Sequence, residues 1–554
     1  MHKSINIAAR RIEGLMVSFF SLIFVIWSSK FIYSTSFVAI DGRRYFCLFD
    51  DAMISMRYAW NLSHGTGLVW NSGEYVQGYT NLLMTLLMSL ITSIFDKTMA
   101  VLFIQVLGVG FMLAIAYISM KIADHIVLED HKSEYQKALI RILAFAFSLL
   151  YYPLAYWSIM GMETGVLTLL LLTGILYAFN YVKSRRYKDI FLTAGCLGLA
   201  FITRNDSLIF AVLIGLFIFW EVIRDKTGRG VYFKLTLAFM IYVAFVAGLL
   251  LFQWFYYGEL MPNTYVLKLT GLSLAARVSD GLRFILPFLI QISFLLIPGT
   301  LITYHRFQKR KLLFLLLVFS SIAYEIYVGG DPWNYWRIMS PTIPLLGLLF
   351  LSAVDHGIQA QSKRQNSWTM LLSTRSYSLQ MCLVTLLGIL VANAYFLPEI
   401  LFLERPFQVS ANQHNVNIAL AVSEVTAMDA SVGVFWAGSI PYFAERKGID
   451  FLGKSDRYIA HLPPDFLGRI GFFEMRSPPG HNKYDLNYSI RLLQPTYIQG
   501  FKWRNQDLSN WVKSRYVEVE YKGIQLLLLQ NSPAVLWEKL DNSFEFSDQD
   551  EAEN

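Results

Sequence analysis

Long uncharged apolar stretches recur between residues 13 and 396, and they constrain the fold more than any motif does. Each approaches the roughly 20 residues that a transmembrane helix needs. Only 16% of the 554 residues are charged, against about 25% in an average soluble domain. A soluble globular enzyme is therefore excluded, and the pattern predicts an α-helical polytopic membrane protein. The segments suitable for spanning are residues 14–36, 99–120, 138–153, 162–181, 189–203, 207–223, 233–254, 284–303, 312–328, 338–354 and 378–396.

Basic residues are distributed unevenly between the connections of these segments. One set, which includes residues 1–12, 224–234 and 355–376, holds 22 lysines and arginines, whereas the alternate set holds 8. Cytoplasmic loops are enriched in Lys and Arg, so the first set is predicted to be cytoplasmic. We expect a bacterial cytoplasmic (inner) membrane location with the N-terminus in the cytoplasm. The net charge of +7 resides in these loops and forms no basic face, so no nucleic-acid partner is predicted.

The apolar segment at 79–95 conflicts with this alternation. A crossing there and another at 99–120 would place the basic stretch 121–141 outside the cytoplasm. The segment has 17 residues and begins with three polar ones, which puts it at the lower limit for a span. We therefore predict a re-entrant or interfacial helix at 79–95, eleven crossings in total, and a C-terminus outside the cytoplasm.

The composition changes after Pro398, and no later run is apolar enough to span a membrane. Residues 1–397 are predicted to form the transmembrane domain, with a first outer loop at 41–78, and residues 398–540 a small extracytoplasmic α/β domain. Residues 541–554 carry six acidic residues and no basic one, which predicts a disordered tail. The strands expected in the second domain are 431–436, 449–452, 495–498 and a hairpin of 516–521 and 524–529 joined by Lys522-Gly523.

Two adjacent carboxylates, Asp50 and Asp51, follow the first span. The chain contains no phosphate-binding glycine loop and no HExxH metal motif, so these acids carry the first chemical hypothesis. At the membrane surface they can hold a divalent cation such as Mg²⁺ or Mn²⁺, or one can act as a general base that the other orients. The structural alternative is helix capping, because Asp51 precedes a helix-like stretch and Asp is a common N-cap residue.

Three cations are predicted on the same side of the membrane as these acids, namely Arg204, Lys268 and Arg337. They are suited to hold an anionic phosphate. For Arg204, pairing with Asp206 explains the residue equally well, because an unpaired charge at a membrane junction is costly. For the nearby Glu163, helix capping is the simpler explanation.

The chain resembles membrane glycosyltransferases of the GT-C superfamily, and most of all the terminal β-(1,2)-arabinofuranosyltransferase family. The resemblance covers nearly the whole chain and rests mainly on the first outer loop, from Asp50-Asp51 to Tyr79-Thr80-Asn81. Shorter strings support it: Gly161-Met162-Glu163-Thr164, Thr203-Arg204, Pro262-Asn263-Thr264, Gly329-Gly330-Asp331 and Pro479-Gly480-His481-Asn482-Lys483-Tyr484-Asp485.

The resemblance implies a GT-C-like fold and transfer of a sugar from a polyprenyl-phosphate donor at the outer face of the membrane. Candidates for the transferred sugar include a pentofuranose such as arabinofuranose. The acceptor would be a cell-envelope glycan or glycolipid, and the chain would be surrounded by membrane lipids. Asp50 or Asp51 would supply the catalytic carboxylate or a metal site, and Arg204, Lys268 and Arg337 would hold the donor phosphate. No cofactor beyond a divalent cation is implied. The substrate-binding residues expected from the matching strings are Arg57, Tyr79, Asn81, Glu163, Asn263, Asp331, His481 and Lys483.

Two other protein classes share the polytopic architecture. A transporter or lipid-linked-sugar flippase is expected to show internal repeats and charges near mid-membrane, whereas here no clear repeat is found and the charges gather at one face. An envelope polysaccharide polymerase would use the same kind of carrier, and the length of its product would distinguish it. For a transferase, single displacement with inversion is the favoured mechanism.

Overall fold

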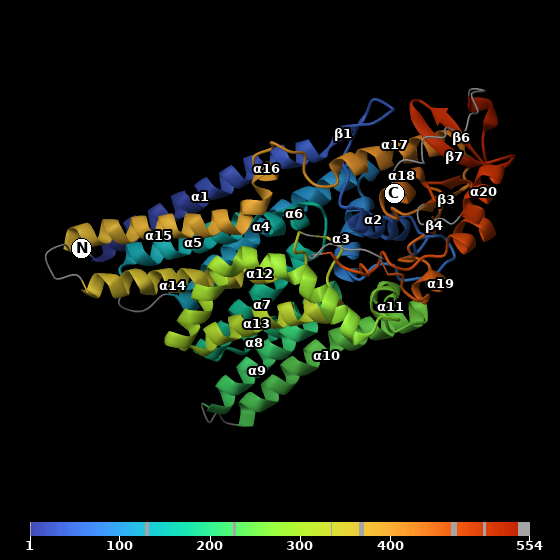
Figure 1. The fold of residues 1–554 in the computed structure, drawn as a ribbon. Coiled ribbons are helices and arrows are strands. Elements are labelled where there is room, and N and C mark those ends of the chain that lie inside the picture. Colours follow the sequence, from blue (N-terminus) through green and yellow to red (C-terminus); the bar gives the residue numbers. More distant parts are fainter. Residues whose placement is uncertain are drawn as a thin grey trace.

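The computed structural model describes residues 2–127, 132–224, 229–333, 335–364, 370–466, 474–501 and 506–540. A long bundle of helices carries at one end a smaller domain with a mixed sheet, and the N-terminus lies at the other end (Figure 1). We call the end with the sheet the domain end. The acidic tail predicted at 541–554 lies outside the described residues.

Nine helices in the described ranges are long and apolar enough to cross a membrane, or ten if the bent pair α5 and α6 forms one span. This pair is bent by 55°, and Pro153 in the first turn of α6 explains the break, because proline starts a helix readily but does not continue one. The bundle helices are α1 (His2–Thr35), α4 (Lys97–Ile126), α5 (Glu134–Leu149), α6 (Tyr152–Ile159), α7 (Thr164–Ser184), α8 (Tyr187–Thr203), α9 (Leu208–Arg224), α10 (Arg229–Tyr257), α12 (Leu274–His305), α13 (Lys309–Val328), α14 (Ile343–Arg364) and α15 (Met370–Asn393).

Helix α8 has 17 residues and is not among these nine, but it reaches through the same depth as α7. The two helices pack side by side and are joined by a short turn. At the far end of the pair, Arg204 Nη1 after α8 lies 2.8 Å from Glu163 Oε1 before α7. Helix α8 thus begins beside the end of α7 and ends beside the start of α7, so the two helices cover the same length of the bundle. Counted with the nine helices and the bent pair, α8 makes eleven bundle elements in the described ranges, and eleven is the number of crossings predicted from the sequence.

The segment predicted to be re-entrant or interfacial forms α3 (Leu82–Thr92), whose 11 residues are too few to span a bilayer. It packs against α2 (Asp50–Ser63) at the domain end. Lys97, at the start of α4, pairs with Glu445 of the sheet domain, with 2.7 Å between Nζ and Oε1. The chain therefore stays at the domain end until α4 begins, as expected for an interfacial helix.

Five strands of the C-terminal domain form one sheet in the order β4-β3-β5-β7-β6. Strand β3 pairs in parallel with β4 and β5, and β7 pairs antiparallel with β5 and β6. The predicted hairpin has the expected bounds, because Lys522 (φ 51°) and Gly523 (φ 75°) adopt the left-handed conformations of a two-residue turn. The strands are β3 (Ser431–Val434), β4 (Lys447–Asp450, two residues earlier than predicted), β5 (Tyr497–Ile498), β6 (Tyr516–Tyr521) and β7 (Ile524–Leu529).

Short elements connect the bundle with the sheet. Helix α17 packs against β7 and α18, and α18 in turn packs against α2, so the sheet domain is seated on the first loop of the chain. The remaining elements are β1 (Phe37–Val38), β2 (Arg44–Tyr45), α11 (Asn263–Leu269), α16 (Leu397–Ile400), α17 (Val409–Val425), α18 (Ser439–Ala444), α19 (Arg457–Ala460), α20 (Gln506–Arg515) and the short turns η1 (Asn205–Ser207), η2 (Ser340–Thr342), η3 (Ala394–Phe396), η4 (Asn487–Leu492) and η5 (Trp537–Lys539).

Helix α2 fastens the sheet domain to the bundle through buried polar side chains. The Asp50 carboxylate accepts hydrogen bonds from Gly438 N (3.2 Å), Ser439 N (2.8 Å) and Ser439 Oγ (2.9 Å). A Cβ on Gly438 would lie 2.0 Å from Asp50 O, so only glycine permits this approach. Two turns later, Arg57 donates to Trp70 O (2.6 Å), to the carbonyl of Pro441 and to Arg446 O (2.8 Å).

Candidate active site

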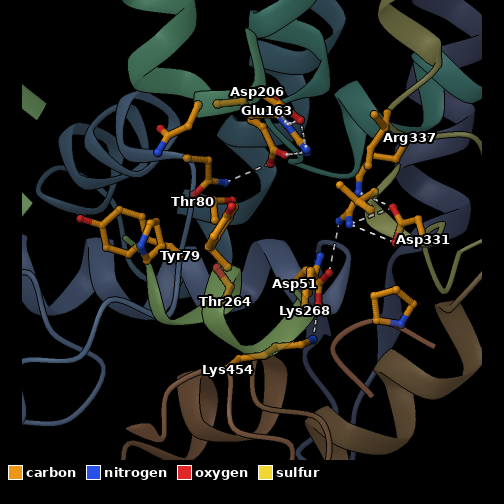
Figure 2. A pocket seen from close by; sticks show the side chains of 18 of the residues that line it. Asp51, Tyr79, Thr80, Glu163, Asp206, Thr264, Lys268, Asp331, Arg337 and Lys454 are labelled. Carbon is orange, nitrogen blue, oxygen red and sulfur yellow. Dashed lines mark hydrogen bonds and ion pairs between the residues drawn. The ribbon is translucent and has the colours of Figure 1, made fainter. Parts of the chain in front are cut away.

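A cavity at the domain end is lined by the start of α2, the residues just before α3 and α7, the turn after α8, α11, the end of α13 with the loop that follows it, and two loops of the sheet domain. Figure 2 shows the charged side chains converging on it. Eight of the thirteen residues predicted from the sequence meet here: Asp51, Tyr79, Asn81, Glu163, Arg204, Lys268, Asp331 and Arg337. The charged groups of the lining are four carboxylates, Asp51, Glu163, Asp206 and Asp331, and four cations, Arg204, Lys268, Arg337 and Lys454.

Asp51 is held between a cation of the sheet domain and a cation of the bundle. Its Oδ1 lies 2.5 Å from Lys454 Nζ, and its Oδ2 lies 3.2 Å from Arg337 Nη1 (Figure 2). Burial alone would raise the pKa of Asp51, but Lys454, Arg337 and Lys268 outweigh it and hold the pKa well below its usual range. Asp51 is therefore an ionised carboxylate at physiological pH. It is the second residue of α2, and no side-chain cap is formed at that helix start, so the capping alternative does not apply.

Arg337 is fixed by a second carboxylate. Its Nε and Nη2 lie 3.0 and 3.2 Å from the two oxygens of Asp331, which is the forked geometry that a guanidinium favours. Burial would lower the pKa of Arg337, but Asp331 and Asp51 together raise it. The left-handed backbone of Gly329 (φ 95°) ends α13 and directs the chain into the loop that carries this pair.

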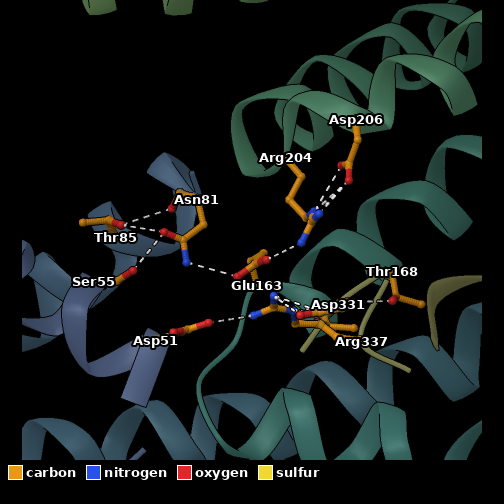
Figure 3. Close-up of polar contacts among 11 residues, drawn as sticks. Asp51, Ser55, Asn81, Thr85, Glu163, Thr168, Arg204, Asp206, Asp331 and Arg337 are labelled. Atoms are coloured by element: carbon orange, nitrogen blue, oxygen red, sulfur yellow. Dashed lines mark hydrogen bonds and ion pairs between the residues drawn. The ribbon is translucent and has the colours of Figure 1, made fainter. Parts of the chain in front are cut away.

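Arg204 is neutralised by two carboxylates on neighbouring elements (Figure 3). Its Nη1 lies 2.8 Å from Glu163 Oε1 and its Nη2 lies 2.6 Å from Asp206 Oδ2. Asn81 Nδ2 donates to the other oxygen of Glu163 at 3.2 Å, and this ties the start of α3 to the pair. The alternative interpretation of the sequence, in which Asp206 neutralises Arg204, agrees with this geometry. Glu163 is a second carboxylate partner of the same arginine.

Lys268 differs from the other three cations of the cavity. Within the part of the chain that the structure describes, its ammonium forms no hydrogen bond and no ion pair. It projects from α11, and its stem passes Gly480, on which a Cβ would lie 3.3 Å from Lys268 Cε. Burial and the nearby Arg337 lower the pKa of Lys268, because both disfavour its charged form. This ammonium is free to take an incoming anion.

Five predicted residues do not line the cavity, and most of their polar groups have other partners. Asp50 and Arg57 bind the sheet domain as described above. Asn263 Nδ2 donates to the backbone carbonyls of the loop that carries Lys454, at 2.9 Å from Gly453 O and 3.0 Å from Lys454 O. The remaining two are Lys483, which donates to Thr270 Oγ1 and Ala460 O, both at 2.8 Å, and His481, which packs edge-on against Trp333 at 5.5 Å.

The two adjacent carboxylates have different partners. The two oxygens of Asp50 accept hydrogen bonds from donors of the sheet domain, and the two oxygens of Asp51 pair with cations. In the described ranges, no three His, Cys, Asp or Glu side chains gather in a way that could hold a metal ion. The Mg²⁺ or Mn²⁺ expected from the sequence therefore has no fitting set of ligands at Asp50 and Asp51.

Sequence reasoning missed Lys454, which follows β4 in the chain and contacts Asp51 403 residues away. Burial lowers the pKa of Lys454, but Asp51, Asp50 and Asp450 together raise it above its usual value, so the lysine stays charged. The loop that carries it is built around Asp450, which accepts hydrogen bonds from Leu452 N (3.0 Å) and Ser455 N (2.8 Å). No motif marks this lysine, because only the docking of the sheet domain brings it to α2.

Comparisons with known proteins add the following. Residues 406–531 match a family model described as a domain of unknown function (DUF8728). A comparison with curated protein sequences finds no match. The match at 406–531 coincides with the sheet domain and assigns it no activity.

Solved structures similar to this chain include ArnT and an archaeal oligosaccharyltransferase. ArnT from Cupriavidus metallidurans in the apo state has a TM-score of 0.57 and 12% identity over 94% of this chain and 98% of ArnT. ArnT bound to undecaprenyl phosphate has the same TM-score at 10% identity, over 94% of this chain and 98% of that structure. The archaeal oligosaccharyltransferase AglB from Archaeoglobus fulgidus, in complex with an inhibitory peptide and a dolichol-phosphate, has a TM-score of 0.52 at 11% identity over 93% of this chain and 74% of AglB. The chain thus has the GT-C-like fold expected from its sequence, a multi-pass helical bundle with a small C-terminal sheet domain.

Proposed function

We propose that this chain is a membrane glycosyltransferase that moves a sugar from a polyprenyl-phosphate carrier to a cell-envelope glycan or glycolipid, on the outer face of a bacterial inner membrane. The observation that carries the proposal is a cavity lined by both the Asp51 carboxylate and Lys268, whose ammonium forms no ion pair among the described residues. A base for a hydroxyl and a cation for a departing phosphate are the two groups that such a transfer needs. The charge distribution of the loops supports the outer face as the place of transfer.

The lipid partners of the similar structures support a polyprenyl-phosphate donor. One ArnT structure holds undecaprenyl phosphate, and the AglB structure holds a dolichol-phosphate. In this chain a narrow apolar cleft between α7, α9 and α13 adjoins the cavity and shares Arg204 and Arg337 with it. Leu167, Leu171 and Phe210 line the cleft, and its volume of about 20 Å³ would have to widen to admit the first apolar units of a polyprenyl chain whose phosphate lies in the cavity.

The proposed reaction is a single displacement with inversion. The acceptor hydroxyl gives its proton to Asp51, its oxygen attacks the anomeric carbon, and the bond between that carbon and the phosphate oxygen breaks. The electron pair of this bond leaves with the polyprenyl phosphate, whose charge Lys268 stabilises, with Arg337 nearby. The transferred sugar, for which a pentofuranose such as arabinofuranose is the first candidate, forms a new glycosidic bond to the acceptor.

The contacts of Asp51 suggest how the donor prepares the base. While Lys454 and Arg337 hold the carboxylate, its pKa is low and it is a weak base. An anionic phosphate in the cavity competes for the same cations. When Lys454 turns from Asp51 to the phosphate, the pKa of Asp51 rises toward its ordinary value, so deprotonation of the acceptor follows donor binding.

The test uses the purified chain in nanodiscs with radiolabelled donors of two kinds, a polyprenyl-monophosphate sugar and a nucleotide sugar. We expect transfer from the lipid-linked donor, one sugar per acceptor. Transfer from the nucleotide sugar alone would refute the proposal, and products carrying many sugars would identify a polymerase. Movement of the lipid-linked sugar across a bilayer without transfer would identify a flippase.

A further inference from the structure

A second cavity lies on the other side of the loop that carries Asp331 and Arg337. Gly330 and these two residues face the candidate active site, whereas Pro332, Trp333 and Tyr335 of the same loop line the second cavity. Its volume of about 390 Å³ is in the range of roughly 300–1,000 Å³ that is typical of small-molecule pockets. The opposite wall comes from the region of α16, where the bundle leads into α17 (Figure 1), and consists of Tyr395, Pro398, Glu399, Glu404 and Phe407.

The lining combines aromatic rings with carboxylates, and none of its described residues is a cation. This combination suits a sugar residue, since its polarised C–H groups pack on the electron-rich face of an aromatic ring and its hydroxyls donate to carboxylates. Glu399 is already held by Tyr152 Oη at 2.5 Å and by Tyr335 Oη. The carboxylate of Glu404 is exposed and has no hydrogen bond or ion pair among the described residues, so it remains available to a ligand.

A cationic headgroup is the other ligand that aromatic rings and acids attract, and ring packing argues against it. Cages for quaternary ammonium groups need several free ring faces around one point. Here Tyr335 and Phe407 stack on each other, with centroids 5.0 Å apart and planes 19° apart, so these two faces are covered. Tyr395, which is 70% exposed, keeps a ring free for flat stacking.

We propose that this cavity, the aromatic subsite, binds a sugar residue of the acceptor at a distance from the reacting hydroxyl. Trp333 packs between the subsite and the start of α2, with its ring 5.1 Å from that of Phe49 and 5.5 Å from that of His481. The two cavities lie on opposite sides of the loop that carries Asp331 and Arg337, so a saccharide whose end reaches Asp51 would extend around this loop to reach the subsite. The identity of the bound sugar as part of the acceptor rests on the proposed function; the ability to bind a saccharide does not.

Binding is measured first without any donor. The chain in nanodiscs is titrated with methyl glucopyranoside, methyl arabinofuranoside and tetramethylammonium, and contacts are followed by saturation-transfer NMR. We expect saturable binding of a methyl glycoside that Tyr395→Ala weakens about fivefold, the effect of losing one stacked ring. The matched control is Tyr304→Ala, a tyrosine 81% exposed on α12 that is not part of the subsite lining, and it should bind as wild type does.

Three outcomes would overturn the aromatic subsite: no glycoside binding by the wild type, equal binding by Tyr395→Ala, or saturable binding of tetramethylammonium that Glu404→Gln abolishes. In turnover assays, Tyr395→Ala should raise KM for the acceptor about fivefold and leave KM for the donor unchanged. If the wild type binds glycosides but transfers no sugar from any lipid donor, the proposed function fails while the saccharide site stands.

Discussion

Replacing Lys268 by methionine separates phosphate binding from structural support. The ammonium forms no ion pair in the described residues, so its removal breaks no contact, and methionine keeps most of the apolar stem beside Gly480. A hydrogen bond to a charged group contributes about 1.5–3 kcal/mol, which corresponds to roughly a 10- to 150-fold loss in kcat/KM for the donor. Because the variant loses a cation held among Arg337 and other charges, its thermal stability should equal or exceed that of the wild type.

Arg204→Met is the contrasting variant. It would leave Glu163, with 3% side-chain exposure, and Asp206 without their partner, and breaking a buried pair in this way costs about 3–5 kcal/mol. We expect lower thermal stability together with weaker binding. The exposed Lys513→Met on α20 should change neither property and serves as the control.

The assay is binding of undecaprenyl phosphate by each purified variant in nanodiscs, followed by a thermal melt of the same samples. The pH dependence adds a second test of Lys268. Its pKa is lowered, so its charge is lost at a lower pH than that of an ordinary lysine, and phosphate affinity should fall as the pH rises through that range. Lys268→Arg keeps its charge and should move the fall to higher pH. The reasoning would be refuted if Lys268→Met bound undecaprenyl phosphate with unchanged affinity while Arg204→Met lost much of its affinity and kept the thermal stability of the wild type. That result would show that Arg204 holds the phosphate.

Other perturbations separate the remaining roles. Asp51→Asn should lose about 10²- to 10⁴-fold in kcat, the usual contribution of a general base, while Asp50→Asn should lower thermal stability with a smaller effect on kcat; equal turnover by Asp51→Asn would exclude it as the base. Incubation with EDTA should leave turnover unchanged, because Asp51 faces cations, and inhibition reversed by Mn²⁺ would require a metal site elsewhere. In intact cells, a membrane-impermeant thiol reagent should label cysteines introduced in 41–77 and not in 355–376, and the reverse pattern would invert the orientation.

The fold could be predicted from local sequence because each of its elements is recognised by a local pattern. Span-length apolar runs indicate the bundle, and the Lys522-Gly523 turn between two alternating strands indicates the hairpin. The run at 79–95 is too short to be predicted as a span, and in the structure it contains the 11-residue α3 at the domain end, where Lys97 pairs with Glu445. The strand at Lys447–Asp450 was displaced by two residues, because it was placed by composition without a turn signal.

The candidate site was predicted less completely, and for a physical reason. Eight residues meet in the cavity, but chain neighbours such as Asp50 and Asp51 project to different partners, since adjacent positions at a helix start lie about 100° apart around the axis. Which acid faces the cavity depends on where α18 docks. The unequal roles of Arg204 and Lys268 also depend on distant partners, because Glu163, at the start of another helix, neutralises Arg204, while no carboxylate of the described ranges pairs with Lys268.

The lining of the cavity has four carboxylates and four cations. Among the described residues each of these cations except Lys268 pairs directly with a carboxylate of the lining. Arg204 is matched by Glu163 and Asp206, and Arg337 by Asp331, so these groups can hold their geometry whether or not a ligand is present. Lys454 is different, because it belongs to the sheet domain and the carboxylate with which it pairs, Asp51, is the proposed base. A phosphate that binds Lys454 in place of Asp51 therefore has two effects: it raises the basicity of Asp51, and it breaks an ion pair between the sheet domain and the bundle.

Donor binding should then weaken the contact between the sheet domain and the bundle. In the wild type this should appear as a change in protease protection of the domain when the donor binds. Lys454→Met should bind donor without that change. Equal protection of the wild-type domain with and without undecaprenyl phosphate would refute the coupling.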